Sequence, residues 1–339
     1  MYSNLLIYYF SGTGNALSVA NWVKENAEKE NIKVQSHSIE KIDKVEIPDL
    51  EGKTLIGLFY PTHGFIAPWL VLMFILKFPK IKNADAFFVN TRGGSKIWKL
   101  HLPGLSGLAQ WFSIFAFWIK GYSVKGSLPI DLPQNWIAIC PPLNKAAINS
   151  MFIHCRKSVD KMTKAMFSGK TFYGYNVWLG LPLDIAIIPI TVGYVFIGRF
   201  FIAKSLYSSY TCNGCELCAT NCPVQAIEMR NDRPYWKYTC ESCMRCMNIC
   251  PKRSIQSWAT RIALLFYVFS AIGVYVSTDL QPIYYNIYFF VIFPFYWILF
   301  KLLRIKFVNV IFTFTSFTRL WGRYLANGVK AKDLKRENL

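Results

Sequence analysis

Two short cysteine runs constrain this chain more than any other feature of its sequence. The first run has the pattern CxxCxxCxxxCP, and the second repeats it; their cysteines are Cys212, Cys215, Cys218 and Cys222, then Cys240, Cys243, Cys246 and Cys250. Three thiolates spaced in this way bind three corners of an iron–sulfur cubane, while the fourth cysteine ligates the other cluster. The pattern therefore predicts two [4Fe–4S] clusters, one on Cys212, Cys215, Cys218 and Cys250 and one on Cys240, Cys243, Cys246 and Cys222.

Zinc and disulfides are the alternatives for these cysteines. Zinc sites are typically built from two CxxC pairs, which are shorter than the runs found here. Disulfides require an oxidising compartment, and the first residues, MYSNLLIYYF, lack the basic segment and the small-residue cleavage site of an export signal. The cluster interpretation is therefore favoured. Cys140 and Cys155 lie outside the runs and are expected to be buried small hydrophobic residues.

Residues 205–256 resemble a bacterial-type dicluster ferredoxin domain, and the resemblance covers both runs without a gap. It implies a small α+β ferredoxin-like fold that carries electrons. The segment holds six basic and four acidic residues, whereas ferredoxins that diffuse freely are usually acidic. We therefore expect this domain to be docked to a membrane or to the N-terminal half of the chain.

The N-terminal region has the pattern of a strand, a glycine turn and a helix. The apolar run 5–10, LLIYYF, precedes Ser11, Gly12, Thr13, Gly14 and Asn15, and a helical pattern extends from Ala16 to about Lys29. Hydroxyl groups, backbone amides and a helix N-terminus together favour an anion. Further strands are expected at Lys33–Ile39, Thr54–Tyr60, Ala86–Asn90 and Ser123–Leu132. Alternation of strands and helices predicts a doubly wound parallel α/β sheet.

The glycine turn lacks the marks of two common nucleotide sites. It has no lysine for a P-loop, and Leu17 stands where a dinucleotide fingerprint needs its third glycine. The turn resembles the phosphate loop of the flavodoxin family, whose cofactor is FMN, over roughly residues 1–150. A plain strand–helix turn is the structural alternative.

The flavodoxin resemblance implies particular site residues. Ser11, Gly12, Thr13, Gly14 and Asn15 would hold the phosphate, although Ala16 replaces the threonine that many flavodoxins have. Two loops would flank the flavin ring, and they consist of Pro61, Thr62, His63 and Gly64, and of Thr91, Arg92, Gly93 and Gly94. Arg92 and Lys96 would stabilise an anionic reduced flavin, unless they are solvated surface residues. His63 is either a proton donor or an ordinary loop histidine.

The composition indicates contact with a membrane, because 53% of the residues are hydrophobic and only 17% are charged. Ile262–Ser277 and Ile283–Phe300 are each close to the length that spans a bilayer, and the tail that follows is basic. They predict a transmembrane helical hairpin with both ends in the cytoplasm; a hairpin packed on the soluble core is the alternative. Val177–Ala203 is expected to be a monotopic or re-entrant helix or a buried linker, and Gly107–Ile119 a sheet-domain helix with an apolar outer face.

These segments predict five regions along the chain. They are a flavodoxin-like domain at 1–170, an apolar linker or membrane-associated helix at 171–204, a ferredoxin domain at 205–256, a helical hairpin at 257–304 and a basic tail at 305–339.

The whole chain resembles the prokaryotic flavodoxin–ferredoxin fusion proteins. The resemblance implies electron transfer within the chain between FMN and two [4Fe–4S] clusters. Together with the apolar segments and the basic tail, it leads us to expect a protein at the cytoplasmic face of the membrane, with redox proteins and membrane lipid as partners. The net charge of +19 also suits nucleic acid, but no nucleic-acid-binding motif is present. Two alternatives stay open: a flavin-dependent reductase of a small molecule or quinone, and a non-catalytic shuttle or redox sensor that has lost the FMN site.

Overall fold

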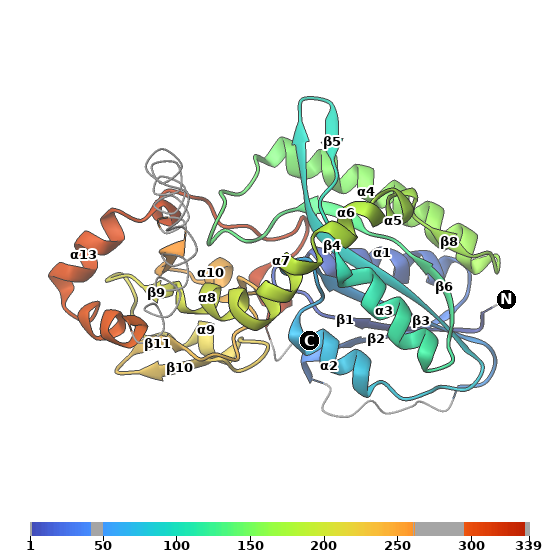
Figure 1. Cartoon of the computed structure of the whole chain (residues 1–339), viewed down its shortest axis with the longest axis horizontal. Coiled ribbons are helices and arrows are strands. Elements are labelled where there is room, and N and C mark those ends of the chain that lie inside the picture. Colours follow the sequence, from blue (N-terminus) through green and yellow to red (C-terminus); the bar gives the residue numbers. More distant parts are fainter. Residues whose placement is uncertain (1, 42–49, 260, 262–294, 336–339) are drawn as a thin grey trace, which may run out of the picture. The chain divides into compact units, whose positions relative to one another are not determined.

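The computed structural model describes residues 2–41, 50–259, 261 and 295–335. The chain divides into two compact units (Figure 1). Unit 1 consists of Met1–Asn135, Leu143–Val195 and Leu325–Leu339, and unit 2 consists of Trp136–Pro142 and Phe196–Tyr324. Unit 2 therefore interrupts unit 1 twice along the sequence.

A parallel sheet forms the centre of unit 1, with the strand order β2-β1-β3-β4-β6-β8. Its strands are β1 (Asn4–Tyr9), β2 (Lys33–Ser38), β3 (Thr54–Pro61), β4 (Ala84–Ile97), β6 (Ser123–Ser127) and β8 (Phe172–Tyr173). β1 pairs in register with β2 on one side and β3 on the other, so the chain changes direction across the sheet between them. This order is that of a doubly wound fold, and it confirms the predicted parallel α/β sheet.

Two strands differ from their predicted bounds. β4 continues to Ile97 because its far half pairs with β7 (Ile130–Pro133) and with the antiparallel strand β5 (Leu100–Leu102). The predicted fifth strand is divided into β6 and β7, which pair with different parts of β4. Pro129 lies at the break, where it has no N–H to continue the ladder.

Two layers of helices cover the sheet of unit 1 (Figure 1). On one face α1 (Asn15–Lys29) packs against α4 (Lys145–Phe167), and on the other α2 (Trp69–Lys77) packs against α3 (Leu108–Ile119). Alternate strand residues point to each layer, as in any pleated strand. Tyr8 and Tyr60 both point to the α2–α3 layer: Tyr8 contacts Phe74 of α2, and the Tyr60 hydroxyl lies 3.0 Å from the Ala109 carbonyl of α3.

The apolar segment after β8 is a series of short helices. They are α5 (Tyr175–Leu179), α6 (Leu181–Ala186), α7 (Ile188–Gly193), a π-helical turn at Tyr194–Gly198 and α8 (Arg199–Lys204). Pro182 and Pro189 occupy the first turns of α6 and α7, where proline starts a helix but cannot continue the one before it. The predicted single apolar segment is therefore broken into pieces too short to span a bilayer.

Unit 2 contains two small antiparallel ribbons, β9 (Leu206–Ser208) with β12 (Ile255–Ser257), and β10 (Ile227–Arg230) with β11 (Arg233–Trp236). Its helices include α9 (Leu217–Thr220), α10 (Arg245–Ile249) and α13 (Lys306–Phe314), and a 3-10 turn follows at Phe317–Arg319. Tyr207, Trp258, Leu299 and Leu303 form its apolar cluster.

The two cysteine runs have the same backbone conformation. At matching positions of the two runs the φ angles are positive, at Glu216 and Met244 and again at Gln225 and Arg253. A short helix follows the first pair of positions, and a strand follows the second. The sequence repeat is therefore also a structural repeat.

Most of the predicted transmembrane hairpin lies outside the described residues, since 262–294 fall in a gap. Residues 295–302 are helical. Within the part of the chain that the structure describes, no helix combines the length and the apolar character needed to cross a bilayer.

Candidate functional site

The glycine turn between β1 and α1 is buried and internally hydrogen-bonded. Ser11 and Thr13 are almost fully buried, and the Gly14 amide donates to Ser11 Oγ over 3.1 Å. Gly14 has φ = 102°, a left-handed conformation that suits glycine, and α1 begins at the next residue without an acidic side chain in its first turn. A helix N-terminus of this kind attracts an anion.

Side chains from the β7 end of the sheet hold this turn. Asn135 Nδ2 donates to Thr13 Oγ1 over 3.0 Å, which leaves the Thr13 hydroxyl with its own hydrogen as a donor. Asn15 Nδ2 donates to the Pro133 carbonyl over 2.9 Å. Thr13 is thus oriented to donate, whereas the Asn15 amide, expected to contact phosphate, ties the turn to β7.

A segment from the other end of the sequence also contacts the turn. We call Leu325–Leu334 the C-terminal strap. The Ala326 amide donates to the Thr13 carbonyl over 2.9 Å, and a Cβ at Gly14 would lie 2.9 Å from Ala326 Cβ and from Val329 Cγ1. In a trans peptide the C=O and the following N–H point in opposite directions. The strap therefore occupies the carbonyl side of the turn and leaves the Gly14 amide on the side of Ser11.

The residues after β3 form a tight turn. The His63 and Ile66 backbones hydrogen-bond to each other, and the His63 side chain is 1% exposed. Gly64 has φ = 54°, and a Cβ there would lie 2.0 Å from the Tyr194 ring. Only glycine allows Tyr194 to lie against this turn.

The predicted second flanking loop is not a loop. Thr91, Arg92, Gly93 and Gly94 belong to β4, where they pair with Ile130, Asp131, Leu132 and Pro133 of β7. A Cβ at Gly94 would lie 2.8 Å from Asp131 Cβ, and one at Gly93 would lie 2.9 Å from Gln134 Cβ. The two glycines therefore allow β7 to approach β4.

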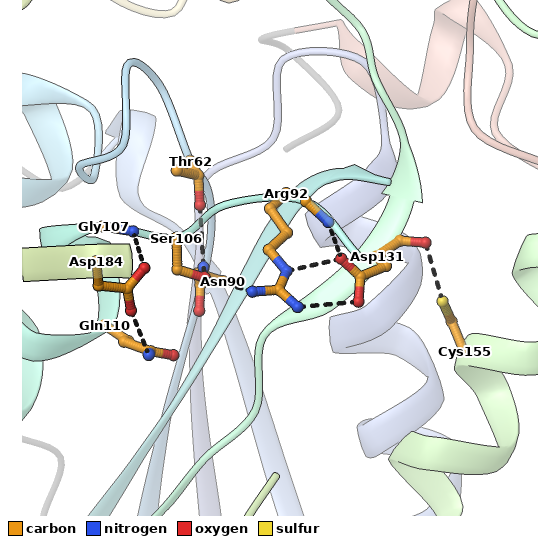
Figure 2. A network of polar contacts seen from close by, with 10 residues as sticks. Thr62, Asn90, Arg92, Ser106, Gly107, Gln110, Asp131, Cys155 and Asp184 are labelled. Atoms are coloured by element: carbon orange, nitrogen blue, oxygen red, sulfur yellow. Dashed lines mark hydrogen bonds and ion pairs between the residues drawn. The ribbon is translucent and has the colours of Figure 1, made fainter. Parts of the chain in front are cut away.

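Arg92 is the centre of a buried polar network (Figure 2). Its Nε and Nη2 donate to the two carboxylate oxygens of Asp131 over 2.6 and 3.1 Å, and Nη1 donates to Ser106 Oγ over 3.2 Å. Asp131 balances the charge of Arg92, which is buried and is therefore not the solvated surface residue of the alternative; a role of Arg92 beside a flavin stays a prediction. Lys96 also has a partner, since its Nζ donates to Ser150 Oγ over 2.6 Å.

The same network joins two neighbouring strands. Asn90 Nδ2 donates to Thr62 Oγ1 over 3.0 Å and to Ser106 Oγ over 3.1 Å (Figure 2). Thr62 directly follows the carboxyl end of β3, the kind of position where doubly wound folds bind ligands. Asn90 lies beside it in the middle of β4, where it pairs with Tyr60 of β3. The predicted residues Thr62 and Arg92 are thus brought together, through Asn90 and Ser106.

In unit 2 the cysteines of the two runs surround two hollows. One hollow is lined by Cys212, Cys215, Cys218 and Cys250, together with Met229, Pro234 and Ile255. The other is lined by Cys222, Cys240, Cys243 and Cys246, together with Val224, Ile227 and Trp236. Each hollow therefore takes three cysteines from one run and the fourth from the other run.

The hollows differ in their access to solvent. Cys215 is exposed in the first, while Cys222, Cys243 and Cys246 are buried in the second. Burial, followed by the neighbouring thiols of Cys212, Cys250 and Cys215, raises the pKa of Cys218 to about 12. Burial likewise raises the pKa of Cys246 well above its usual value. Metal binding at these thiols therefore requires proton release.

Two buried cations lie near the second hollow. Lys204 is 1% exposed, and its ammonium group lies 4.1 Å from the Tyr238 ring and 4.5 Å from the Tyr296 ring. Burial lowers the pKa of Lys204 to about 8, and the Cys240 thiol opposes this shift. Arg245, next to Cys246, is also 1% exposed and donates to the Asn221 carbonyl over 3.3 Å. Unit 2 therefore places positive charge inside, close to its thiols.

The described residues contain no group of three or more His, Cys, Asp or Glu side chains that could hold a single metal ion. None of the ten cysteines forms a disulfide. Cys155 is buried, as expected, whereas the expectation for Cys140 is wrong because its side chain is exposed. Cys140 lies in the Trp136–Pro142 segment, which leaves the sheet after β7.

Several site residues had no role in the sequence interpretation. Asn90 ends a predicted strand, and Ser106, Asp131 and Asn135 are polar residues near strand ends, a position that could have marked them. Ala326 and Tyr194 are different, because they reach the site from segments distant in sequence. No local signal identifies them.

No protein-family profile matches the sequence, and no curated protein sequence matches it. Solved structures with a similar fold include a Streptococcus pneumonia TIGR4 flavodoxin, at 15% identity over 48% of this chain and 99% of that chain, with a TM-score of 0.33. Flavodoxin 1 from Bacillus cereus is 14% identical over 47% of this chain and 98% of that chain, with a TM-score of 0.32. A rubredoxin oxygen:oxidoreductase from Desulfovibrio gigas is 12% identical over 48% of this chain and 36% of that chain, with a TM-score of 0.29.

These similarities are weak, so we assign the fold of unit 1 from its own strand order. The order β2-β1-β3-β4-β6, with all neighbours parallel and a glycine turn after β1, is that of a flavodoxin. The N-terminal half of the chain therefore has a flavodoxin-like fold.

Proposed function

We propose that this chain is an electron-transfer protein that binds two [4Fe–4S] clusters in unit 2 and FMN in unit 1. The observation that carries the proposal is the exchange of one cysteine between the two runs, so that four thiols line each hollow. In two-cluster ferredoxins the fourth cysteine of each run ligates the other cluster. A cubane binds its thiolates at four separate irons, which suits thiols that surround a hollow.

Bound clusters would carry one electron each, and FMN would accept or donate one or two. The residues of unit 2 would hold the clusters and keep water away from them. Met229, Pro234 and Ile255 line the first hollow, and Val224, Ile227 and Trp236 line the second. Apolar surroundings and limited solvent access are among the factors that set cluster potentials.

Buried cations support the same proposal. A cubane with four thiolates is negatively charged, and a buried charge needs a partner. Lys204 and Arg245 are both almost fully buried, and both lie close to the cysteines of the second hollow. These two residues would balance the charge of a bound cluster.

In unit 1 the turn after β1 fits a phosphate group. Its hydroxyls are those of Ser11 and Thr13, and the Gly14 amide at the start of α1 donates to Ser11 Oγ, which leaves the Ser11 hydroxyl hydrogen for an acceptor. Asn135 orients the Thr13 hydroxyl, and the C-terminal strap supports the carbonyl side. Phosphate would be held by these donors and by the helix N-terminus, without a lysine or arginine in the turn.

Anaerobic purification of the full chain, with iron, sulfide and flavin quantification, tests the proposal. About eight irons and one FMN per chain are expected, since each cubane holds four irons. Cys215→Ala should lower the iron content by about half, while Cys140→Ala, in an exposed cysteine outside the runs, should not change it. Iron that stays the same in Cys215→Ala would contradict the ligand assignment.

The exchange of cysteines has its own test. Cys215→Ala and Cys250→Ala should disturb the same cluster, although they lie in different runs, because both line the first hollow. Cys243→Ala and Cys222→Ala should disturb the other. Electron paramagnetic resonance of the reduced variants should therefore group them by hollow. Grouping by run would overturn the exchange and leave the presence of clusters intact.

A further inference from the structure

One helical layer of unit 1 has its polar residues inside and its apolar residues outside. In α6 and α7 the buried positions are Asp184, Ile187 and Thr191, which share one helix face. The exposed positions are all apolar, and they include Leu183, Ile185, Ile190 and Val192. This is the reverse of a helix that faces water.

The helix α3 has an apolar outer side as well. Its buried side mixes the polar Gln110 and Ser113 with Ala109, Ala116 and Phe117, and the Ser113 hydroxyl lies 2.6 Å from the Tyr60 hydroxyl. The outward side chains are Phe115, Trp118 and Ile119, each about 60% exposed or more. A large exposed apolar patch marks an interaction surface.

Asp184 connects these elements with apolar outer sides. Its carboxylate accepts from the Gly107 amide over 2.7 Å and from Gln110 Nε2 over 3.4 Å (Figure 2). It also accepts from Trp111 Nε1 over 3.2 Å. These hydrogen bonds join α6 to the beginning of α3. The ring centroids of Trp178 in α5 and Trp111 in α3 lie 5.7 Å apart. The apolar sides of α3, α5, α6 and α7 therefore belong to one layer, which we call the apolar face.

The opposite layer of the same sheet is built in the usual way. In α4, Met151, Val159 and Met162 point inward, while Lys157, Lys161 and Lys164 are exposed. Arg156 of α4 forms ion pairs with Glu25 of α1 and with Asp160. The α1–α4 layer of unit 1 thus exposes charged side chains to water, whereas the layer that contains α3 exposes apolar ones.

The charge of the apolar layer favours anionic lipid as its partner. The α2–α3 layer carries basic residues at its helix ends: the exposed Lys77 ends α2, the exposed Lys80 follows it, and Lys120 follows α3, while the sequence from Ala86 to Ile130 has no Asp or Glu. Within α5 to α7 the one acidic residue is Asp184, which is turned inward and 4% exposed. Basic and aromatic residues beside an apolar helix side are typical of attachment to anionic bilayers.

We propose that the apolar face lies in the boundary between the headgroups and acyl chains of an anionic bilayer, with its helices parallel to the membrane plane. The length of the helices requires this orientation, since α3 has 12 residues and α6 and α7 have six each. Trp118 and Trp178 lie on the face, and tryptophan favours the membrane interface. The attachment is independent of the cofactors.

Photolabelling of the full chain with a diazirine dissolved in the lipid tests the proposal locally. The chain is reconstituted in vesicles of phosphatidylcholine and phosphatidylglycerol, and labelled peptides are quantified by mass spectrometry. Peptides of α3 and of α5 to α7 should be labelled several-fold more than the α4 peptide that contains Ile153. Ile153 is a matched control, because it is 62% exposed and Ile119 is 63% exposed.

Equal labelling of α3 and α4 would overturn the proposal. It would mean that the apolar face is either exposed to water or covered by another protein. Omission of phosphatidylglycerol should lower the labelling of α3; no change would overturn the role of anionic lipid. Ile119→Glu should reduce labelling of the apolar face about tenfold, since a charge opposes insertion, while Ile153→Glu should leave it unchanged. Trp118→Ser, which adds no charge, provides a second variant if Ile119→Glu does not fold.

Discussion

The turn after β3 requires glycine at position 64. Its φ is positive, and the Tyr194 ring occupies the space in which a Cβ would lie. Tyr194 comes from the end of the apolar segment, so this contact fixes that segment on the sheet of unit 1. The position is therefore constrained both by backbone conformation and by packing.

Gly64→Ala should destabilise unit 1 by about 2–4 kcal/mol, because it combines backbone strain with a steric overlap. Gly169→Ala is the matched control. Gly169 also has a positive φ, of 85°, but no atom lies within 4 Å of its Cβ position. Chemical denaturation of both variants would separate strain from overlap. Equal losses of stability would mean that the Tyr194 contact contributes nothing.

Lys204 is expected to tune the cluster of the second hollow. It is buried among three tyrosine rings close to Cys240. Lys204→Met removes a positive charge and should therefore lower the reduction potential by on the order of tens of millivolts. Potentiometric titration would measure the shift, with the exposed Lys306→Met as control. An unchanged potential would show that the Lys204 charge is screened from the cluster.

Arg92 illustrates what residue patterns do and do not predict. The sequence predicts Arg92 in a loop just after a strand, whereas the structure places it inside β4, which continues to Ile97. The sequence does not reveal that Asp131 binds it with two hydrogen bonds. That pairing depends on the register between β4 and β7, which is a tertiary property.

At the scale of elements, the C-terminal strap is the least expected part of the candidate FMN site. Ala326 is buried against Gly14, where a Cβ on the glycine would lie 2.9 Å from the Ala326 Cβ, and the Ala326 amide donates to the Thr13 carbonyl. The strap therefore stabilises one conformation of the turn, in which the Gly14 amide faces Ser11. Preorganisation of this kind increases affinity.

Ala326→Asp should weaken FMN binding about tenfold or more, because it places a bulky negative charge beside the turn. Flavin fluorescence titration would measure the dissociation constant. Ala331→Asp introduces the same change at an exposed position of the strap and should have little effect. Equal affinities of the two variants would exclude a role for the strap.

The regular elements of unit 1 were largely predictable. β1, the glycine turn and α1 follow from an apolar run, small residues and a helical pattern, and β2 and β3 lie within one residue of their expected bounds. The β4–β5 ribbon was missed because Gly93 and Gly94 disfavour a strand in isolation. Residues 91–94 of β4 pair with β7, and no local pattern reveals that pairing.

At the scale of the whole molecule, unit 1 is discontinuous. The chain leaves it after Asn135 and after Val195, and returns at Leu143 and at Leu325. The predicted division into consecutive domains did not include such returns, because a sequence read in order gives no sign of contacts between its distant parts. The glycine turn is consequently held by residues from opposite ends of the sequence.

A fragment of residues 1–195 should therefore bind FMN about tenfold more weakly than the same fragment joined to residues 325–335 by a flexible linker. The linker makes the strap an intramolecular ligand with a high effective concentration. Fluorescence titration of both proteins would test this, with Ala326→Asp in the joined strap as control. If the two fragments bind equally, the turn does not need the strap.

The contact between Ala326 and Thr13 also sets an order of events during synthesis. The ribosome makes the glycine turn before both cysteine runs and the strap after them. The hydrogen bond from Ala326 to Thr13 therefore forms only after the segments between them have been made. A chain interrupted before Ala326 would lack that hydrogen bond. Firm retention of flavin would then indicate that synthesis had passed both cysteine runs, since these precede the strap in the sequence.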